Sequence, residues 1–150
     1  MTWAEALRSH VEARLRDDLG LVVGGPLAPD DDGDYWVERD GVRCWVRLPD
    51  GEEPTLVRVW APVARDLRPT RAVLAEVNDL NAGLRLVRVY HRGRSVWAVA
   101  ELVAESIEPG ELGRVVEAVL HTVRHAGQLL ATVHGGAWAG DEEAMEEPAV

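Results

Sequence analysis

The sequence predicts an α+β fold: an antiparallel β-sheet of about five strands with helices, in the order α-β-β-β-α-β-β-α. Two observations predict it. Apolar residues recur at helical spacing in three segments, 2–19, 69–83 and about 109–134. Between these segments, runs that alternate apolar with polar residues are joined by short turns, which is typical of antiparallel strands. At 150 residues, the chain is long enough for one domain with a buried core.

The first helix is predicted at residues 2–19. Thr2 and Glu5 have the spacing of a capping box, and Gly20 provides the stop. Apolar residues recur along it at helical spacing: Trp3, Leu7, Val11, Leu15 and Leu19. The following segment, LVVGGPLAP, fits a short edge strand and then a loop. No GK[ST] follows its two glycines, so it does not match a phosphate-binding loop.

The first hairpin is centred on Asp40-Gly41, a turn dipeptide between two alternating runs. A two-residue turn there places Trp36 opposite Trp45, and side chains that lie opposite each other share a face. The core face then carries Tyr35, Val37, Cys44, Val46 and Leu48, and the other face carries Trp36, Glu38, Arg43, Trp45 and Arg47. The third strand continues this division, with Val57, Val59 and Ala61 inward and Leu56, Arg58 and Trp60 outward.

The second half repeats the pattern with one helix, one hairpin and a last helix. Pro69 suits the first turn of the helix at 69–83, and Gly83 ends it. The hairpin turns at Arg92-Gly93 or Gly93-Arg94, and both turns give the same faces. Val87, Val89, Val96, Ala98 and Ala100 point inward; Leu86, Arg88, Tyr90, Trp97, Val99 and Glu101 point outward. The last helix, about 109–134, carries a broad apolar stripe and stops at Gly135-Gly136.

The formal net charge of −10 is concentrated in two segments. The loop PDDDGD and the tail GDEEAMEEPAV together hold nine acidic residues, which leaves the remainder of the chain nearly neutral. We therefore divide the chain into one domain, 1–138, and an acidic tail, 139–150. We expect the tail to be disordered because it has few large apolar side chains to bury.

Several classes of protein are disfavoured. The N-terminus has no apolar signal-peptide region, and no run of about eighteen apolar residues suggests a membrane span, which favours the cytoplasm. Cys44 is the single cysteine, so an internal disulfide and a cysteine metal cluster are excluded. It falls on the core face, where cysteine behaves as a small hydrophobic residue rather than a nucleophile. We expect no cofactor and no catalytic residue.

Two polar clusters have structural explanations. Glu117, His121 and His125 form one row on the last helix, but the row lies opposite the apolar stripe and lacks a further ligand. We expect it to be a solvated face rather than a metal site. Asn78 and Asn81 lie near the end of the second helix, where we expect them to cap carbonyls or to tie the helix to the next strand. Contact with a partner is the alternative.

The outward face of the sheet is the sharpest candidate site. We name it the aromatic–arginine face, with the members Trp36, Trp45, Trp60, Tyr90, Trp97, Arg43, Arg47, Arg58 and Arg88. Each aromatic side chain offers about 150–250 Å², so five half-exposed ones would exceed the roughly 300–600 Å² of the largest apolar patch on a typical monomer. We expect a partner, a second copy or a helix of the same chain to cover it. Cation–π pairing among its own residues is a further alternative.

The segment LAEVNDLNAGLRLVRVY, followed by a hairpin that ends in WAVAEL and a long last helix, resembles the YbjN-like and type III secretion chaperone-like domains. The resemblance covers about residues 3–135 and is most specific at VNDLN. It implies helices packed on a curved antiparallel sheet, frequent homodimers, binding of peptides or proteins, and no catalysis. No functional residue carries over, since the asparagine pair matches a structural position. The acidic tail and the Asp-rich loop depart from the family pattern.

These observations favour a non-enzymatic, chaperone-like module. It would capture a client segment on the aromatic–arginine face or at a free sheet edge. The candidate partner-binding residues are Trp36, Trp45, Arg58, Trp60, Arg88, Tyr90 and Trp97. One alternative is binding of single-stranded nucleic acid by base stacking, against which stand the negative charge and the absence of lysine. A purely dimerising regulatory domain is another.

Overall fold

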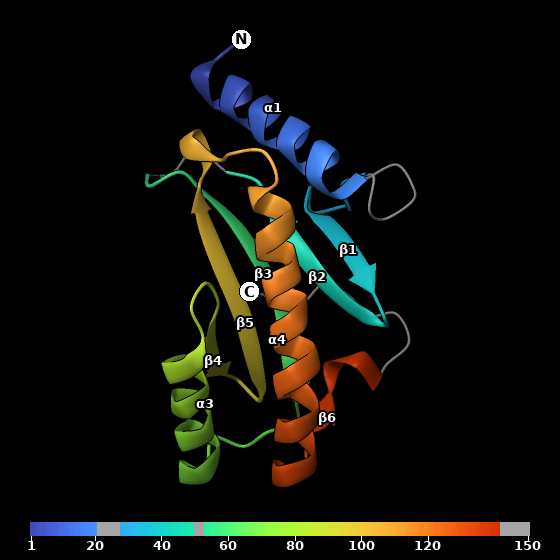
Figure 1. The fold of residues 1–150 in the computed structure, drawn as a ribbon, viewed down its shortest axis with the longest axis vertical. Helices are drawn as coiled ribbons and strands as arrows, with labels where there is room; N and C mark the ends of the chain where they lie inside the picture. Colours follow the sequence, from blue (N-terminus) through green and yellow to red (C-terminus); the bar gives the residue numbers. More distant parts are fainter. Residues whose placement is uncertain (21–27, 50–52, 142–150) are drawn as a thin grey trace.

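The computed structural model describes residues 1–20, 28–49 and 53–141. It has two layers, an antiparallel sheet and a layer of helices in front of it (Figure 1). The helices are α1 (Trp3–Leu15), α3 (Arg71–Gly83) and α4 (Glu111–His134). The strands are β1 (Tyr35–Arg39), β2 (Val42–Arg47), β3 (Leu56–Arg65), β4 (Arg88–Arg92), β5 (Ser95–Val103) and β6 (Ala137–Trp138). The predicted α+β class and the order of its main elements are confirmed. The edge strand expected in LVVGGPLAP falls largely on residues 21–27, outside the described residues.

The strands lie in the order β1-β2-β3-β5-β4, and all neighbours are antiparallel. β6 pairs with the end of β3, with Ala64 opposite Trp138. This sixth strand is additional to the five or so strands that the sequence predicts. Its two residues follow directly on the glycines that end α4, and so short a segment has no alternation to detect.

Both hairpins have the predicted register. Trp36 lies opposite Trp45 across the Asp40-Gly41 turn, and both turn residues have the positive φ that such a turn requires. In the second hairpin, Tyr90 lies opposite Trp97, and the turn is Gly93-Arg94. The division of the strands into an inward and an outward face is therefore confirmed.

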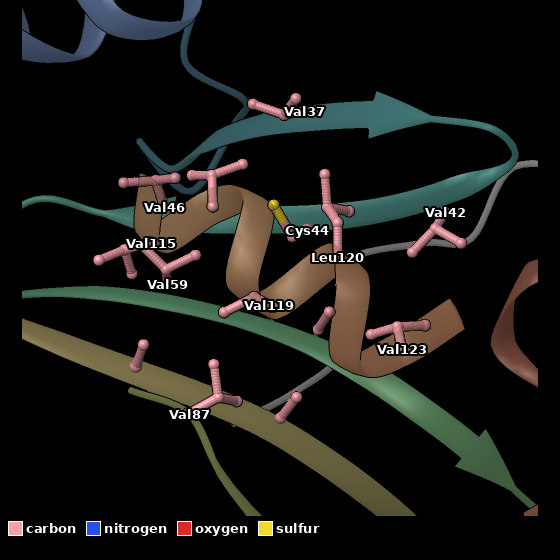
Figure 2. Packing of buried hydrophobic residues seen from close by; sticks show 14 of the residues in the cluster. Val37, Val42, Cys44, Val46, Val59, Val87, Val115, Val119, Leu120 and Val123 are labelled. Carbon is pink, nitrogen blue, oxygen red and sulfur yellow. The ribbon is translucent and has the colours of Figure 1, made fainter. Parts of the chain in front are cut away.

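The main core lies between the inward face of the sheet and the helices. α4 crosses this face, and Figure 2 shows Val115, Val119, Leu120 and Val123 of α4 beside inward side chains of the strands. Cys44 lies among them and is fully buried. Burial raises the pKa of its thiol to about 12, so the thiolate that a nucleophile requires is suppressed.

Asp18, in the turn that follows α1, caps the start of α4, and this contact was not predicted from the sequence. α1 begins with the predicted capping box of Thr2 and Glu5, and it continues beyond Leu15 as a π-helical turn, Arg16–Gly20. In this turn, the carboxylate of Asp18 accepts the backbone N–H groups of Gly110 (2.9 Å) and Gly113 (3.2 Å) at the start of α4. A carboxylate there pairs with N–H groups that have no partner within the helix.

The C-terminal segment holds α4 to the sheet through Trp138. Its indole Nε1 donates a hydrogen bond of 3.0 Å to the carbonyl of Val123. A 3-10 turn, η3 (Ala139–Asp141), follows, and Ala139 is buried in the main core. The described fold thus continues past residue 138, where the sequence analysis placed the end of the domain.

Gly127→Ala in α4 is expected to destabilise the protein by about 1–3 kcal/mol, because overpacking a tight contact costs this much. The added Cβ would overlap the indole of Trp138 and lie 2.5 Å from the carbonyl oxygen of Val63. The measurement is urea denaturation.

Gly113→Ala in the same helix is the matched control. Its Cβ would lie 3.6 Å from the Cβ of Asp18, an ordinary contact, and alanine favours the helix by up to about 1 kcal/mol over glycine. Equal stability of the two variants would contradict close packing of Trp138 on α4.

Candidate functional site: the second face of the sheet

The aromatic–arginine face is continuous across the sheet because its members fall in shared cross-strand rows. One row runs from Trp36 through Trp45 and Trp60 to Val99 and Arg88. A second row contains Arg47, Arg58 and Glu101. Neighbouring members of a row lie about 5 Å apart, close enough for their side chains to interact.

Two of the tryptophans are buried, which corrects the expectation that the five aromatic side chains are half exposed. Trp45 and Trp60 are 1% and 0% exposed and form a second apolar cluster with Val99. The two rings stack with centroids 6.3 Å apart. Tyr90 and Trp97 are partly buried against this cluster, and Trp36 keeps 39% of its surface exposed. Rings in one row cover each other, and an expectation based on isolated rings does not include this mutual burial.

The second cluster is made by strands alone. Its members come from β2, β3 and β5, with Tyr90 of β4 and Trp97 of β5 packed against them. The buried apolar residues of α1 and α4, and Val77 of α3, belong instead to the main core on the other face. The tryptophans are therefore core residues, and replacing Trp45 would damage the fold as well as any binding surface.

Two arginines lie over tryptophan rings. The guanidinium carbon of Arg43 is 4.0 Å from the ring centroid of Trp36, and that of Arg47 is 4.9 Å from that of Trp60. The planar guanidinium group covers an apolar ring and still presents its N–H donors sideways. Cation–π pairs within the chain, one of the expected alternatives, are thus present, and they do not exclude contact with a partner.

The arginines of this face are also paired with carboxylates. Arg43 binds Glu38 at 2.9 Å, and Arg47 binds Asp34 at 2.7 Å. Asp34 comes from the acidic loop PDDDGD and is buried, and the carboxylate of Asp30 accepts its backbone N–H. That loop is therefore attached to the fold by Asp30 and Asp34 and is not simply a run of solvated charges. The sequence contained a signal for this, since Asp and Asn often bond to the backbone of their own turns.

Arg58 and Arg88 differ from Arg43 and Arg47 because both bind the same carboxylate, that of Glu101. Arg58 lies 2.9 Å from one oxygen of Glu101, and Arg88 lies 3.3 Å from the other. Val103 of β5 stands on the same face at 51% exposure, and Leu86, in the bend before β4, is 65% exposed and lines a hollow together with Arg88, Val99 and Glu101. Another hollow, of about 350 Å³, borders this group, lined by Arg47, Leu48, Glu53, Pro54, Leu56, Arg58 and Glu101. This part of the face combines three arginines, two glutamates and apolar surface.

The two edges of the sheet are unlike each other. At the outer edge of β4, the side chain of Asn81 accepts the N–H of Val89 and donates to its carbonyl, both at 2.8 Å. Further along, Nε2 of His91 lies 2.7 Å from the carbonyl oxygen of Leu67. Asn81 thus ties α3 to the following strand, as predicted, whereas Asn78 is exposed. At the other edge, β1 pairs with β2 alone in the part of the chain that the structure describes.

The histidine row has the solvated character that was expected. His121 and His125 are exposed, with ring centroids 4.0 Å apart. Glu117 forms ion pairs with Arg39 and Arg124. Within residues 1–20, 28–49 and 53–141, no group of three potential ligands could hold a metal ion.

A model of the family described as T3SS (YopN, CesT) and YbjN peptide-binding chaperone 1 matches residues 5–142. The chain belongs to this family. The resemblance inferred from VNDLN and its flanking elements is confirmed, and the family is one of peptide-binding chaperones. No curated protein sequence matches the chain.

Solved structures with a similar fold confirm the architecture. One is a chain of the crystal structure of the ExsC–ExsE complex, with a TM-score of 0.63 and 19% sequence identity. The match covers 83% of this chain and 96% of that chain. At this identity the likeness concerns the fold. Of the helices in the described residues, none is long and apolar enough to cross a membrane.

Asn81→Ala is expected to lower the free energy of unfolding by about 1–3 kcal/mol, because it leaves the N–H and carbonyl of the buried Val89 without partners. Asn78→Ala, three residues earlier on the same helix, is the control and should change stability by less than about 0.5 kcal/mol. Urea denaturation gives both values, and hydrogen exchange at the Val89 amide should speed up in the first variant alone. Unchanged hydrogen exchange at the Val89 amide would contradict the hydrogen bonds between Asn81 and Val89.

Proposed function

We propose that this chaperone captures an extended client segment, which carries both acidic and apolar residues on one side, on the aromatic–arginine face. The observation that carries the proposal is the sharing of Glu101 by Arg58 and Arg88, beside the exposed Leu86 and Val103. An extended segment presents alternate side chains to one side. Its carboxylates would meet the guanidinium groups while its apolar residues cover the leucine and valine. The role is one of binding, without catalysis.

The buried tryptophans support this surface from beneath rather than contacting the client over their full area. Trp45 and Trp60 pack beneath the face, and Glu101 holds Arg58 and Arg88 in place before binding. Preorganised groups lose less conformational entropy when a ligand binds. Of the candidate residues, Trp36, Arg58 and Arg88 would contact the client directly, and Tyr90 and Trp97 through their exposed parts.

The β1 edge is the alternative place for the same client. A strand added beside β1 would gain backbone hydrogen bonds and would lie next to Trp36. The β4 edge is less suited to strand addition, because Asn81 already occupies the backbone groups of Val89. Binding of single-stranded nucleic acid is disfavoured, since Trp45 and Trp60 have no exposed ring face on which a base could stack.

We further propose a homodimer, formed through the helix layer. Burial of Trp45 and Trp60 removes the expected excess of exposed aromatic surface as a reason for dimerisation. The helix layer supplies another reason, because Leu74 on α3 and Leu129 and Val133 on α4 are exposed. A second copy that covers these side chains would remove their apolar surface from water.

Selection of a random 12-residue peptide library displayed on phage tests the client chemistry. On the full chain, we expect enrichment of peptides that carry both Asp or Glu and apolar residues at every second position, on one side of an extended segment. Arg58→Gln with Arg88→Gln should abolish this enrichment, whereas Arg71→Gln with Arg114→Gln, two exposed arginines of α3 and α4, should keep it. The same peptides on both double variants would show that the face is not the site. A photoreactive residue at position 86, beside β4 at the opposite edge of the sheet from β1, should crosslink the client if it binds the face and not if it adds to β1.

The dimer is tested by light scattering at micromolar concentration. The mass should be about twice 16.5 kDa. Leu129→Gln with Val133→Gln should shift it to the monomer, while Leu86→Gln, an exposed leucine on the opposite face, should leave the dimer intact. A monomer mass for the parent at high concentration would refute the proposal.

A further inference from the structure

The described chain ends beside the strands that carry the aromatic–arginine face. The last turn, η3 (Ala139–Asp141), packs against β2 and β3. It also adjoins the turn between β1 and β2, since a Cβ added at Gly41 would lie 3.5 Å from the carbonyl oxygen of Gly140. From this turn, β2 leads directly to the arginines and tryptophans of the face.

The nine residues that follow, EEAMEEPAV, have the chemistry of the proposed client. They contain four glutamates and no basic residue, together with Met145, Pro148 and Val150. The two glutamate pairs are separated by Ala144 and Met145, so acidic and apolar groups are interleaved. The segment therefore complements a surface on which Arg58 and Arg88 share one carboxylate beside exposed Leu86 and Val103.

We propose that residues 142–150 bind in cis to the aromatic–arginine face and act as an internal competitor of the client. The inference rests on the proposed function in using the same face. It adds a regulatory step, because a client segment must displace the chain's own carboxylates. Peptides that carry only charge, or only apolar residues, would gain too little to do so.

The length of the segment is sufficient. Nine extended residues span about 30 Å at roughly 3.3 Å each, whereas the six residues of β2 span about 20 Å. A tail anchored at η3 can therefore pass along β2 and reach the guanidinium groups beyond it. A short tether of this kind gives an effective concentration in the millimolar range. A segment with a dissociation constant near 100 μM would then reduce binding of a competing peptide about tenfold or more.

The experiment uses a full-length variant in which Glu142, Glu143, Glu146 and Glu147 are all changed to Gln. The control changes Asp17, Asp31, Asp32 and Asp79 to Asn, which removes the same amount of charge from exposed positions outside the face. The probe is a fluorescent peptide, DEEAMEEPAV, and its binding is measured by anisotropy. We expect the neutral-tail variant to bind the probe about tenfold more tightly than the parent and the control variant.

Two further measurements connect the probe to the face. Adding Arg58→Gln and Arg88→Gln to the neutral-tail variant should abolish probe binding, and raising the salt concentration should weaken it. Adding Arg71→Gln and Arg114→Gln instead should leave it unchanged. Equal affinity of the probe for the parent, the control and the neutral-tail variant overturns the proposal, as does absence of binding to all three.

The outcome is separable from that of the proposed function. If the neutral-tail variant enriches peptides from the library but does not bind the probe, the tail proposal alone fails. If the probe binds through Arg58 and Arg88 but no library peptide is enriched on any variant, the client proposal fails and the face serves the tail.

Discussion

β3 is buried on both sides, and the other elements are arranged to meet that requirement. On one side, Val57 and Val59 pack into the core beneath the helices; on the other, Trp60 lies against Trp45 and Val99. A strand in this position needs strand neighbours along both edges and apolar cover on both faces. β2, β5 and β6 supply the edges. The second face of the sheet is therefore part of the packed structure itself, and any partner would bind to a surface that the fold requires.

The strands and their faces could be predicted because the information is local. Asp40-Gly41 sets the first register, and from it the alternation assigns every side chain of β1 and β2 to a face. The burial of Trp45 and Trp60 could not be predicted in this way, since it depends on rings from different strands stacking in one row. Pairings such as Asp18 with α4, or Asp34 with Arg47, join residues whose proximity exists only after folding. The same holds for Trp138, whose two-residue strand carries no pattern.

An acidic chain that lines a sheet face with arginine is explained by the partners of those arginines. Asp34, Glu38 and Glu101 each lie within ion-pair distance of an arginine of the face. Lysine would serve less well, because a compact and strongly hydrated ammonium group neither lies flat on an indole nor binds a carboxylate through two donors. Arg43 and Arg47 do both, with a ring beneath and a carboxylate beside. The guanidinium groups thereby shield apolar rings that would otherwise face water.

The group of Arg58, Glu101 and Arg88 explains how such a face is stable without a ligand and could still attract the proposed acidic client. Two guanidinium groups held close together without an anion would repel each other. Glu101 offsets this repulsion by giving one oxygen to each arginine. One positive charge remains uncompensated within the trio, and both arginines keep donors that a second carboxylate could accept. The attraction that we propose for an acidic segment would arise from this one excess positive charge in the trio, although the chain as a whole carries a net charge of −10.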